Sequence, residues 1–242
     1  SDPVADLAAS TGVAPSVESP RMDLHCNVLG LFNVLEGARG TGVTSFVFAS
    51  SSASVGEVTP PIHEGAAPSP VSPYGASKLA GEGYCSAYFQ TYGLKTVALR
   101  FGNVYGPLSV HKDSVVARFF KRALAGKPLE IYGDGTQTRD FIFIEDLVDA
   151  ILSAVRSDVG GEVFQIATNR ETTVNEIARL VKGIVEEHTG EPVELLHGSE
   201  RSGDVKRSYS DISKARQKLG WEPRFTIEQG LRATFQYFIS EQ

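Results

Sequence analysis

Short apolar runs alternate with helical segments along the chain, and this alternation restricts the fold more than any other feature of the sequence. Residues 44–50, 95–101 and 162–168 read TSFVFAS, KTVALRF and EVFQIAT. They are apolar on both faces, as is typical of strands that are covered on both sides of a sheet. Helical patterns lie between them, so the sequence predicts an α/β fold with a parallel sheet.

Six segments have the spacing of apolar residues expected of amphipathic helices. They are residues 20–39, 73–92, 114–125, 145–156, 173–188 and 227–240. Two of them follow the pairs Ser19-Pro20 and Ser72-Pro73, which combine an N-cap with a proline in the first helical turn. The stretch 56–73 is rich in Pro, Gly and Ser, and we expect it to be a loop that carries function.

The character of the chain changes after the motif RFGNVYGP, which ends at residue 107. Later segments are more polar, with short predicted strands such as LEIY and VELL. We expect residues 1–106 and 143–168 to form the main sheet domain. Residues 107–142 and 169–242 are then expected to form a smaller α/β lobe. In doubly wound sheets ligands bind beyond the carboxyl ends of the strands, so chemistry is expected in the loops after residues 50, 101 and 168.

Composition excludes several classes of function. The 242 residues carry a formal net charge of −6 without a Lys/Arg run, which argues against nucleic acid or an anionic membrane as partner. No apolar run is long enough to cross a membrane and no secretory pattern is visible, so we expect a cytoplasmic protein. The five His and two Cys residues lack metal-ligand spacing. We expect no metal, and Cys26 and Cys85 as buried thiols in a reducing compartment.

The stretch SPYGASKLAGE, residues 72–82, places Tyr74 and Lys78 four positions apart on one face of a predicted helix. Ser51 lies just past the end of a predicted strand. A nearby ammonium is expected to lower the pKa of a phenol from about 10. These three residues suit proton abstraction from an alcohol while hydride leaves its carbon. A surface Tyr–Lys pair beside ordinary turn serines explains the same spacing, and the three residues alone leave both interpretations open.

Further short motifs occur in a fixed order around these residues. They are NVLGLFNVLEGAR, FASSS, LRFGNVYGP, PLEIYGDGTQTRDFIFIEDL, RSGDV and DISKARQKLGWEP. With them the chain resembles the extended short-chain dehydrogenase/reductase family, and within it the nucleotide-sugar epimerases of the UDP-glucose 4-epimerase type. The resemblance runs from about Leu7 to the C-terminus. It implies a truncated Rossmann-like, doubly wound parallel sheet that binds NAD, with a smaller α/β lobe that binds substrate.

The resemblance also implies roles for individual residues. Tyr74 resembles the catalytic base, and Lys78 resembles its partner, which also holds the nicotinamide ribose. Ser51 matches the serine that hydrogen-bonds the reacting sugar hydroxyl, and Ser52 takes that place if the loop has another register. The remaining implied cofactor contacts are Asn27, Ser50 and the backbone near Phe101.

The substrate-side residues implied by the resemblance lie later in the chain. Asn103 and Arg139 look like ligands of a sugar-nucleotide diphosphate. Arg201 and Asp204, in RSGD, would hold a phosphate and the uridine ribose, because an arginine fork suits phosphate oxygens and a carboxylate accepts ribose hydroxyls. Surface ion pairs and an N-cap remain the alternative roles for these charged residues. The small Ser208 replaces a bulky aromatic of some relatives and is expected to leave room for a 2-acetamido sugar.

The implied reaction is a redox-neutral epimerisation of a UDP-hexose through a transient 4-keto sugar. Tyr74 would remove the O4 proton while NAD takes the C4 hydride, which then returns to the other face of the sugar. The sugar dehydratases of the family carry Asp-Glu directly after the catalytic hydroxyl residue, and the related decarboxylases keep the Glu. Ser52 and Ala53 occupy these positions, which favours an epimerase.

The chain also departs from the family pattern. No glycine-rich turn with an acidic residue about 20 positions later is present. Asp6 stands in place of a usual histidine and Val55 in place of a usual tyrosine. We therefore expect either a fragment of a longer protein or self-association that covers a bare sheet edge. The predicted helices at 20–39 and 73–92 resemble the pair through which family members form homodimers. The alternative function is that of a degenerate, non-catalytic relative that binds a sugar nucleotide or a partner chain.

Overall fold

The computed structural model describes residues 2–200 and 205–240. Contacts divide the chain into two compact units. Unit 1 contains Ser1–Gly102, Val148–Ile166 and Ser210–Glu222, and unit 2 contains Asn103–Leu147, Ala167–Tyr209 and Pro223–Gln242. Each unit is described separately.

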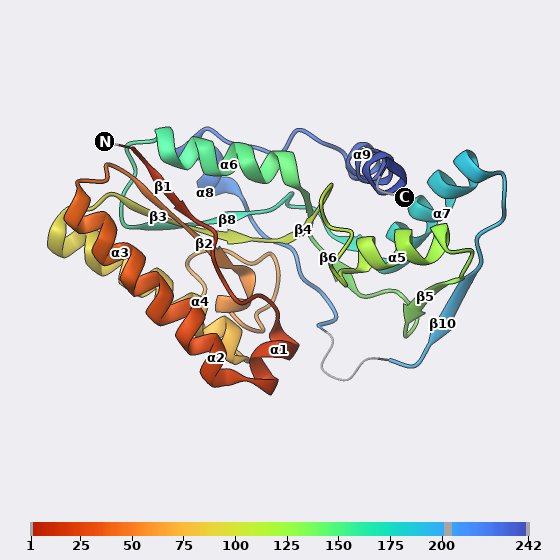
Figure 1. The fold of residues 1–242 in the computed structure, drawn as a ribbon, viewed down its shortest axis with the longest axis horizontal. Helices are drawn as coiled ribbons and strands as arrows, with labels where there is room; N and C mark the ends of the chain where they lie inside the picture. Colours follow the sequence, from red (N-terminus) through yellow and green to blue (C-terminus); the bar gives the residue numbers. More distant parts are fainter. Residues whose placement is uncertain (1, 201–204, 241–242) are drawn as a thin grey trace. The chain divides into compact units, whose positions relative to one another are not determined.

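Unit 1 is built on a four-stranded, fully parallel sheet (Figure 1). Its strands, in spatial order, are β1 (Val4–Asp6), β2 (Phe46–Ser51), β3 (Thr96–Phe101) and β8 (Glu162–Ile166). The parallel α/β sheet predicted from the apolar runs is confirmed, with strand ends that differ from the prediction by a few residues. β1 forms one edge of the sheet.

The helices of unit 1 pack against its sheet or against one another. They are α1 (Val13–Glu18), α2 (Pro20–Leu24), the π-helical turn η1 (His25–Leu29), α3 (Gly30–Thr41), α4 (Pro73–Tyr92), the later part of α6 (Ile144–Arg156) and α8 (Ser213–Leu219). The predicted helix 20–39 is present as α2, η1 and α3 in direct succession. A buried cluster joins α3 and α4 to the sheet through Leu31, Leu35, Phe46, Phe48 and Tyr88 among others.

Two details of these helices were not predicted from the sequence. Gly81 allows α4 to approach the sheet closely, because a Cβ at this position would lie 2.4 Å from the Phe48 ring. Cys85 is buried, but Cys26 is exposed. The expectation of two buried thiols is therefore wrong for Cys26, because that position in η1 faces away from the cluster that buries Cys85.

Among the described residues, unit 2 contains three small two-stranded sheets and three helices of its own (Figure 1). The sheets pair β4 (Asn103–Tyr105) with β7 (Phe141–Phe143), β5 (Leu129–Tyr132) with β10 (Leu195–Gly198), and β6 (Thr138–Arg139) with β9 (Thr172–Thr173). The helices are α5 (Val115–Leu124), α7 (Val174–Thr189) and α9 (Ile227–Ser240). Aromatic residues Phe119, Phe120 and Phe235 are fully or almost fully buried in its core, which gives this unit an apolar centre independent of the parallel sheet.

Residues 210–222 pack in unit 1, whereas we expected them in the second lobe. Ser210 forms a β-bridge with Ile62. The Lys214 ammonium donates to the Val163 carbonyl of β8 at 2.7 Å, and Lys218 pairs with Glu162 at 2.6 Å. These contacts join segments that are about 50 to 150 residues apart, so local sequence patterns do not reveal them.

Within residues 2–200 and 205–240, no helix is long and apolar enough to cross a membrane. The same residues hold no group of three or more His, Cys, Asp or Glu placed to bind a metal ion.

Candidate active site

Helix α4 presents Tyr74 and Lys78 from its first two turns. The Ser72 hydroxyl caps the helix by accepting from the Gly75 amide at 3.1 Å, and Pro73 occupies the first turn. A Cβ on Gly75 would lie 2.3 Å from the Ala53 carbonyl oxygen. Glycine at this position therefore lets the start of α4 reach the turn that follows β2.

That turn decides which serine faces Tyr74. Ser51 ends β2, and the Ser51 hydroxyl accepts from the Ala53 amide at 3.2 Å and hydrogen-bonds the Tyr74 phenol. The Ser52 hydroxyl instead donates to the Phe101 carbonyl at 3.1 Å. Between the two candidates from the sequence, the geometry favours Ser51 as the partner of Tyr74.

The Lys78 side chain is buried beside this pair. Its ammonium donates to the Ala49 carbonyl at 2.8 Å and lies 5.9 Å from the centre of the Tyr74 ring. Burial lowers the pKa of Lys78, while the charges of Asp6 and Asp23 act in the opposite direction. The two carboxylates thus favour a charged ammonium in a poorly solvated place.

Burial also controls the phenol. Burial raises the pKa of Tyr74. The Ser51 hydrogen bond acts against this increase, and the Asp23 charge adds to it. The lowered phenol pKa that we expected from the neighbouring lysine is therefore wrong for this structure. Desolvation is the largest cause of the shift, and the Lys78 ammonium, which bonds the Ala49 carbonyl, is not among its causes.

Asn27 holds the segment after β1 against α4. Its side-chain amide donates to the Ser10 carbonyl at 3.0 Å and to Asp23 Oδ1 at 2.9 Å, and its Oδ1 accepts from the Ser10 amide at 2.8 Å. The same amide donates to the Ser77 hydroxyl at 3.2 Å. The Asn27 side chain is thus already engaged by protein groups. Sequence reasoning missed Asp23, although its spacing of four from Asn27 is a detectable signal.

The other two predicted cofactor contacts, Ser50 and the backbone of Phe101, bond to other protein groups. The Ser50 hydroxyl donates to Glu82 Oε1 at 2.5 Å, and the Phe101 carbonyl accepts from Ser52. The Ser50 side chain is thus buried, and its donor is already used by Glu82.

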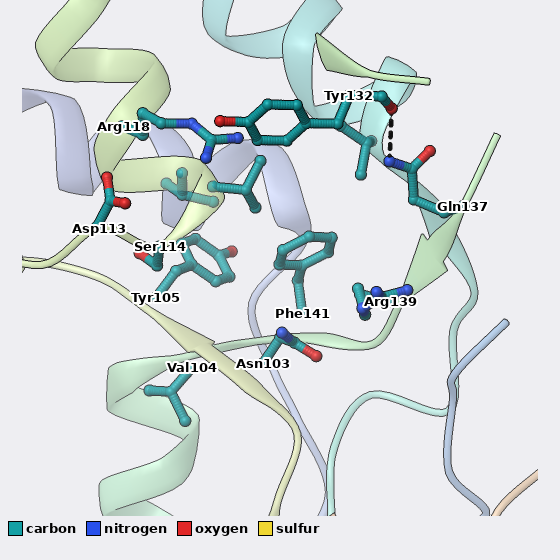
Figure 2. A pocket seen from close by; sticks show the side chains of 13 residues that line it. Asn103, Val104, Tyr105, Asp113, Ser114, Arg118, Tyr132, Gln137, Arg139 and Phe141 are labelled. Carbon is teal, nitrogen blue, oxygen red and sulfur yellow. Dashed lines mark hydrogen bonds between the residues drawn. The ribbon is translucent and has the colours of Figure 1, made fainter. Parts of the chain in front are cut away.

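Unit 2 contains a separate cavity of about 210 Å³. Among the predicted substrate residues, Asn103 and Arg139 both line it. Figure 2 shows Arg118 and Tyr132 together on another side of this cavity, where the guanidinium carbon lies 4.7 Å from the centre of the ring. Tyr132 lies in the motif PLEIYGDGTQTRDFIFIEDL, but neither Tyr132 nor Arg118 was predicted as a site residue.

The remaining predicted residues are placed only in part. Arg201 and Asp204 lie outside the described residues. Ser208 is half-buried. The structure thus brings Ser51, Tyr74 and Lys78 together in unit 1, and Asn103 with Arg139 in unit 2.

Comparison with known proteins shows the family to which the chain belongs. The family described as GDP-mannose 4,6 dehydratase matches residues 1–234. The UDP-glucose 4-epimerase of Mycolicibacterium smegmatis is 38% identical over 236 residues, which are 96% of this chain and 74% of that protein. The chain belongs to the epimerase/dehydratase family of short-chain dehydrogenases/reductases. A dTDP-glucose 4,6-dehydratase of Xanthomonas campestris, 32% identical over all of this chain and 73% of its own length, represents another activity within the family.

Solved structures of the family have the same fold. The UDP-glucose 4-epimerase of Thermotoga maritima with UDP-glucose matches 98% of this chain and 77% of its own, with 39% identity and a TM-score of 0.90. The UDP-N-acetylglucosamine 4-epimerase of Methanobrevibacter ruminantium, in complex with UDP-N-acetylmuramic acid, matches 100% and 77%, with 32% identity and a TM-score of 0.94. A UDP-glucuronic acid 4-epimerase of Bacillus cereus, in complex with UDP-glucuronic acid and NAD, matches 98% and 74%, with 31% identity and a TM-score of 0.86.

Proposed function

We propose that this chain carries the catalytic residues of an NAD-dependent UDP-hexose 4-epimerase. The observation that carries the proposal is the convergence of three side chains: the buried Lys78 ammonium lies 5.9 Å from the centre of the Tyr74 ring, and the Ser51 hydroxyl lies beside the Tyr74 phenol and opposes the increase of its pKa that burial causes. Relatives and structural neighbours named as epimerases of UDP-glucose, UDP-glucuronate and UDP-N-acetylglucosamine support the same reaction class.

The residues present fit one half of the proposed cofactor. An ammonium group has three donors, and in the described part of the chain Lys78 uses one of them, toward Ala49. The other donors, together with Tyr74, suit the hydroxyls of the nicotinamide ribose. The 242 residues contain no glycine-rich turn for the pyrophosphate. When bound, NAD supplies the acceptor and donor of the C4 hydride.

The protein residues manage the proton. In the proposed reaction Tyr74 Oη takes the proton from the sugar O4 hydroxyl, and Ser51 Oγ orients that hydroxyl through a hydrogen bond. The Lys78 charge stabilises the resulting phenolate across a poorly solvated site, where electrostatic interactions are stronger than in water. Return of the proton to O4 completes an isomerisation in which no atom is gained or lost.

We propose that the cavity of unit 2 receives the nucleotide. The Arg139 guanidinium suits a phosphate oxygen, and Asn103 lines the same cavity. Arg118 stacked on Tyr132 offers a flat wall for a base. Arg201 and Asp204 stay proposed ligands of phosphate and ribose, and the small Ser208 is proposed to admit a 2-acetamido sugar.

A turnover and binding experiment tests the function. The chain is mixed with NAD and UDP-glucose, and UDP-galactose is measured by NMR; Trp221 fluorescence reports NADH binding in parallel. We expect slow but measurable conversion, and also conversion of UDP-N-acetylglucosamine. UDP binding without NADH binding or turnover would instead establish the second candidate, a non-catalytic sugar-nucleotide binder. That candidate is favoured by Asp6, whose buried carboxylate replaces the family histidine.

We also propose that two copies associate through α3 and α4. Phe32, Tyr84 and Tyr92 lie on these helices and are 38%, 39% and 52% exposed. Phe32 packs edge-on against Tyr84 at 6.0 Å, so the exposed rings are neighbours rather than scattered. A monomer in dilute solution by light scattering would contradict this homodimer.

A cytoplasmic location is part of the proposal, because Cys26 and Cys85 are both free thiols.

A further inference from the structure

A buried carboxylate lies one helical turn beyond Lys78, outside the proposed catalytic set. Glu82 on α4 is 5% exposed. Its Oε1 accepts from the hydroxyls of Ser50 at 2.5 Å and Ser54 at 2.9 Å. Arg100 donates to both carboxylate oxygens, at 2.8 Å from Nε and 2.7 Å from Nη2. Four donors therefore converge on one side chain that has almost no access to water.

The donors are placed around the turn that carries the candidate catalytic serine. Ser50 directly precedes Ser51, and Ser54 ends the short helical turn Ser52–Ser54. Both hydroxyls bind the same oxygen of Glu82. Arg100 lies opposite Ser50 in the register of β2 with β3. Glu82 thus joins both ends of the Ser51 turn to the helix that also carries Tyr74 and Lys78.

This network is costly if its only purpose is stability. A buried ion pair pays a desolvation penalty, and apolar residues of similar volume often serve stability equally well. Arg100 Nη1 is buried without a hydrogen-bond partner among the described residues, which adds to that cost. A network of fixed donors and acceptors does, however, specify one arrangement of the groups it joins.

We propose that Glu82 is a positioning residue for the active site. Held by Arg100, its carboxylate fixes the Ser50 and Ser54 hydroxyls and so keeps the Ser51 hydroxyl against the Tyr74 phenol. The inference rests on the proposed roles of Ser51 and Tyr74 in proton transfer. The competing interpretation is a core ion pair that contributes only to stability.

The test must loosen the turn without leaving a buried charge unpaired. Glu82→Gln leaves Arg100 without its counter-charge and can fail to fold for that reason. The double variant Ser50→Ala/Ser54→Ala removes both tethers and keeps the Glu82–Arg100 pair. Thr96→Val is the matched control, because it removes a buried hydroxyl of unit 1 that bonds the Cys85 carbonyl at 2.6 Å and no residue of the turn.

The readout is the ¹³Cζ resonance of Tyr74 at pH 8 in ¹³C-tyrosine-labelled protein, assigned with Tyr74→Phe. Ser51→Ala defines its position when the Ser51 hydrogen bond is absent. We expect the resonance of the double variant to move most of the way to that position and the Thr96→Val resonance to stay at the wild-type position. In an active protein, kcat should fall on the order of tenfold or more with the KM for UDP-glucose nearly unchanged.

The outcomes separate this inference from the proposed function. A wild-type Tyr74 resonance in the double variant, with a melting temperature lowered as in Thr96→Val, would overturn the positioning role. A shifted resonance in a protein that never turns over UDP-glucose would uphold the positioning role and refute the epimerase activity of the chain.

Discussion

The two units prepare their candidate sites in different ways. In unit 1, Ser51, Tyr74 and Lys78 are held by hydrogen bonds to one another or to the backbone of β2 and the turn after it. In unit 2, Asn103 on the wall of the cavity is exposed. The side chains proposed for catalysis are thus held in place by the protein, whereas the proposed binding cavity offers an exposed polar side chain to a ligand.

The largest expected effect is a loss of kcat without a loss of UDP binding. Tyr74→Phe removes the proton-transferring oxygen from unit 1 and should lower kcat about 10²- to 10⁴-fold. The Kd for UDP, measured by calorimetry, should stay at the wild-type value because the proposed nucleotide cavity is in unit 2. Tyr88→Phe, which removes a phenol oxygen of the same helix that donates to Glu36 at 2.6 Å, is the control and should leave both quantities unchanged. Weakened UDP binding in Tyr74→Phe would break the division between the units.

An intermediate effect is expected from the cavity itself. Arg118→Ala removes the guanidinium that lies over Tyr132 and is proposed to contact the base, and a stacking or cation–π contact with the base would contribute about 0.5–2 kcal/mol to binding. UDP should therefore bind about two- to thirtyfold more weakly, measured by the same calorimetry. Arg216→Ala, which changes an exposed arginine of unit 1, serves as the charge-matched control. Equal losses in the two variants would mean that overall charge, and not this cavity wall, binds the nucleotide.

The smallest effect concerns acid stability at the rim of unit 2. Hydrogen bonds from Arg207 and Thr138 lower the pKa of Glu171 to about 2. Because the folded pKa lies below the ordinary value of 4.5, the stabilisation is complete above about pH 4.5 and is lost as the pH falls toward 2. The pair is partly exposed, so solvent screening limits the contribution to under about 1 kcal/mol.

Urea unfolding of wild type and Glu171→Gln between pH 2 and 6 measures this contribution. The difference in the free energy of unfolding between the two proteins should shrink as the pH falls through that window. A difference that is the same at every pH would show that Glu171 does not titrate with a lowered pKa.

Much of the fold and part of the site were predictable from sequence. Runs such as KTVALRF identified β2, β3 and β8, and helical spacing located α4 to α7 and α9 closely. The motif SPYGASKLAGE identified Tyr74 and Lys78, because a spacing of four places two side chains on one helix face. All of these signals are local, and local periodicity is set by the geometry of a single helix or strand.

Tertiary structure alone decided the rest. The choice of Ser51 over Ser52 depends on which hydroxyl reaches Tyr74 and which reaches Phe101. The Glu82 network joins residues 18 to 32 positions apart. The raised pKa of Tyr74 and the exposure of Cys26 depend on burial. Sequence determined which elements form and which chemical groups they carry. Desolvation and long-range hydrogen bonds exist only once the elements pack, so only the packed structure determined how those groups are oriented and ionised.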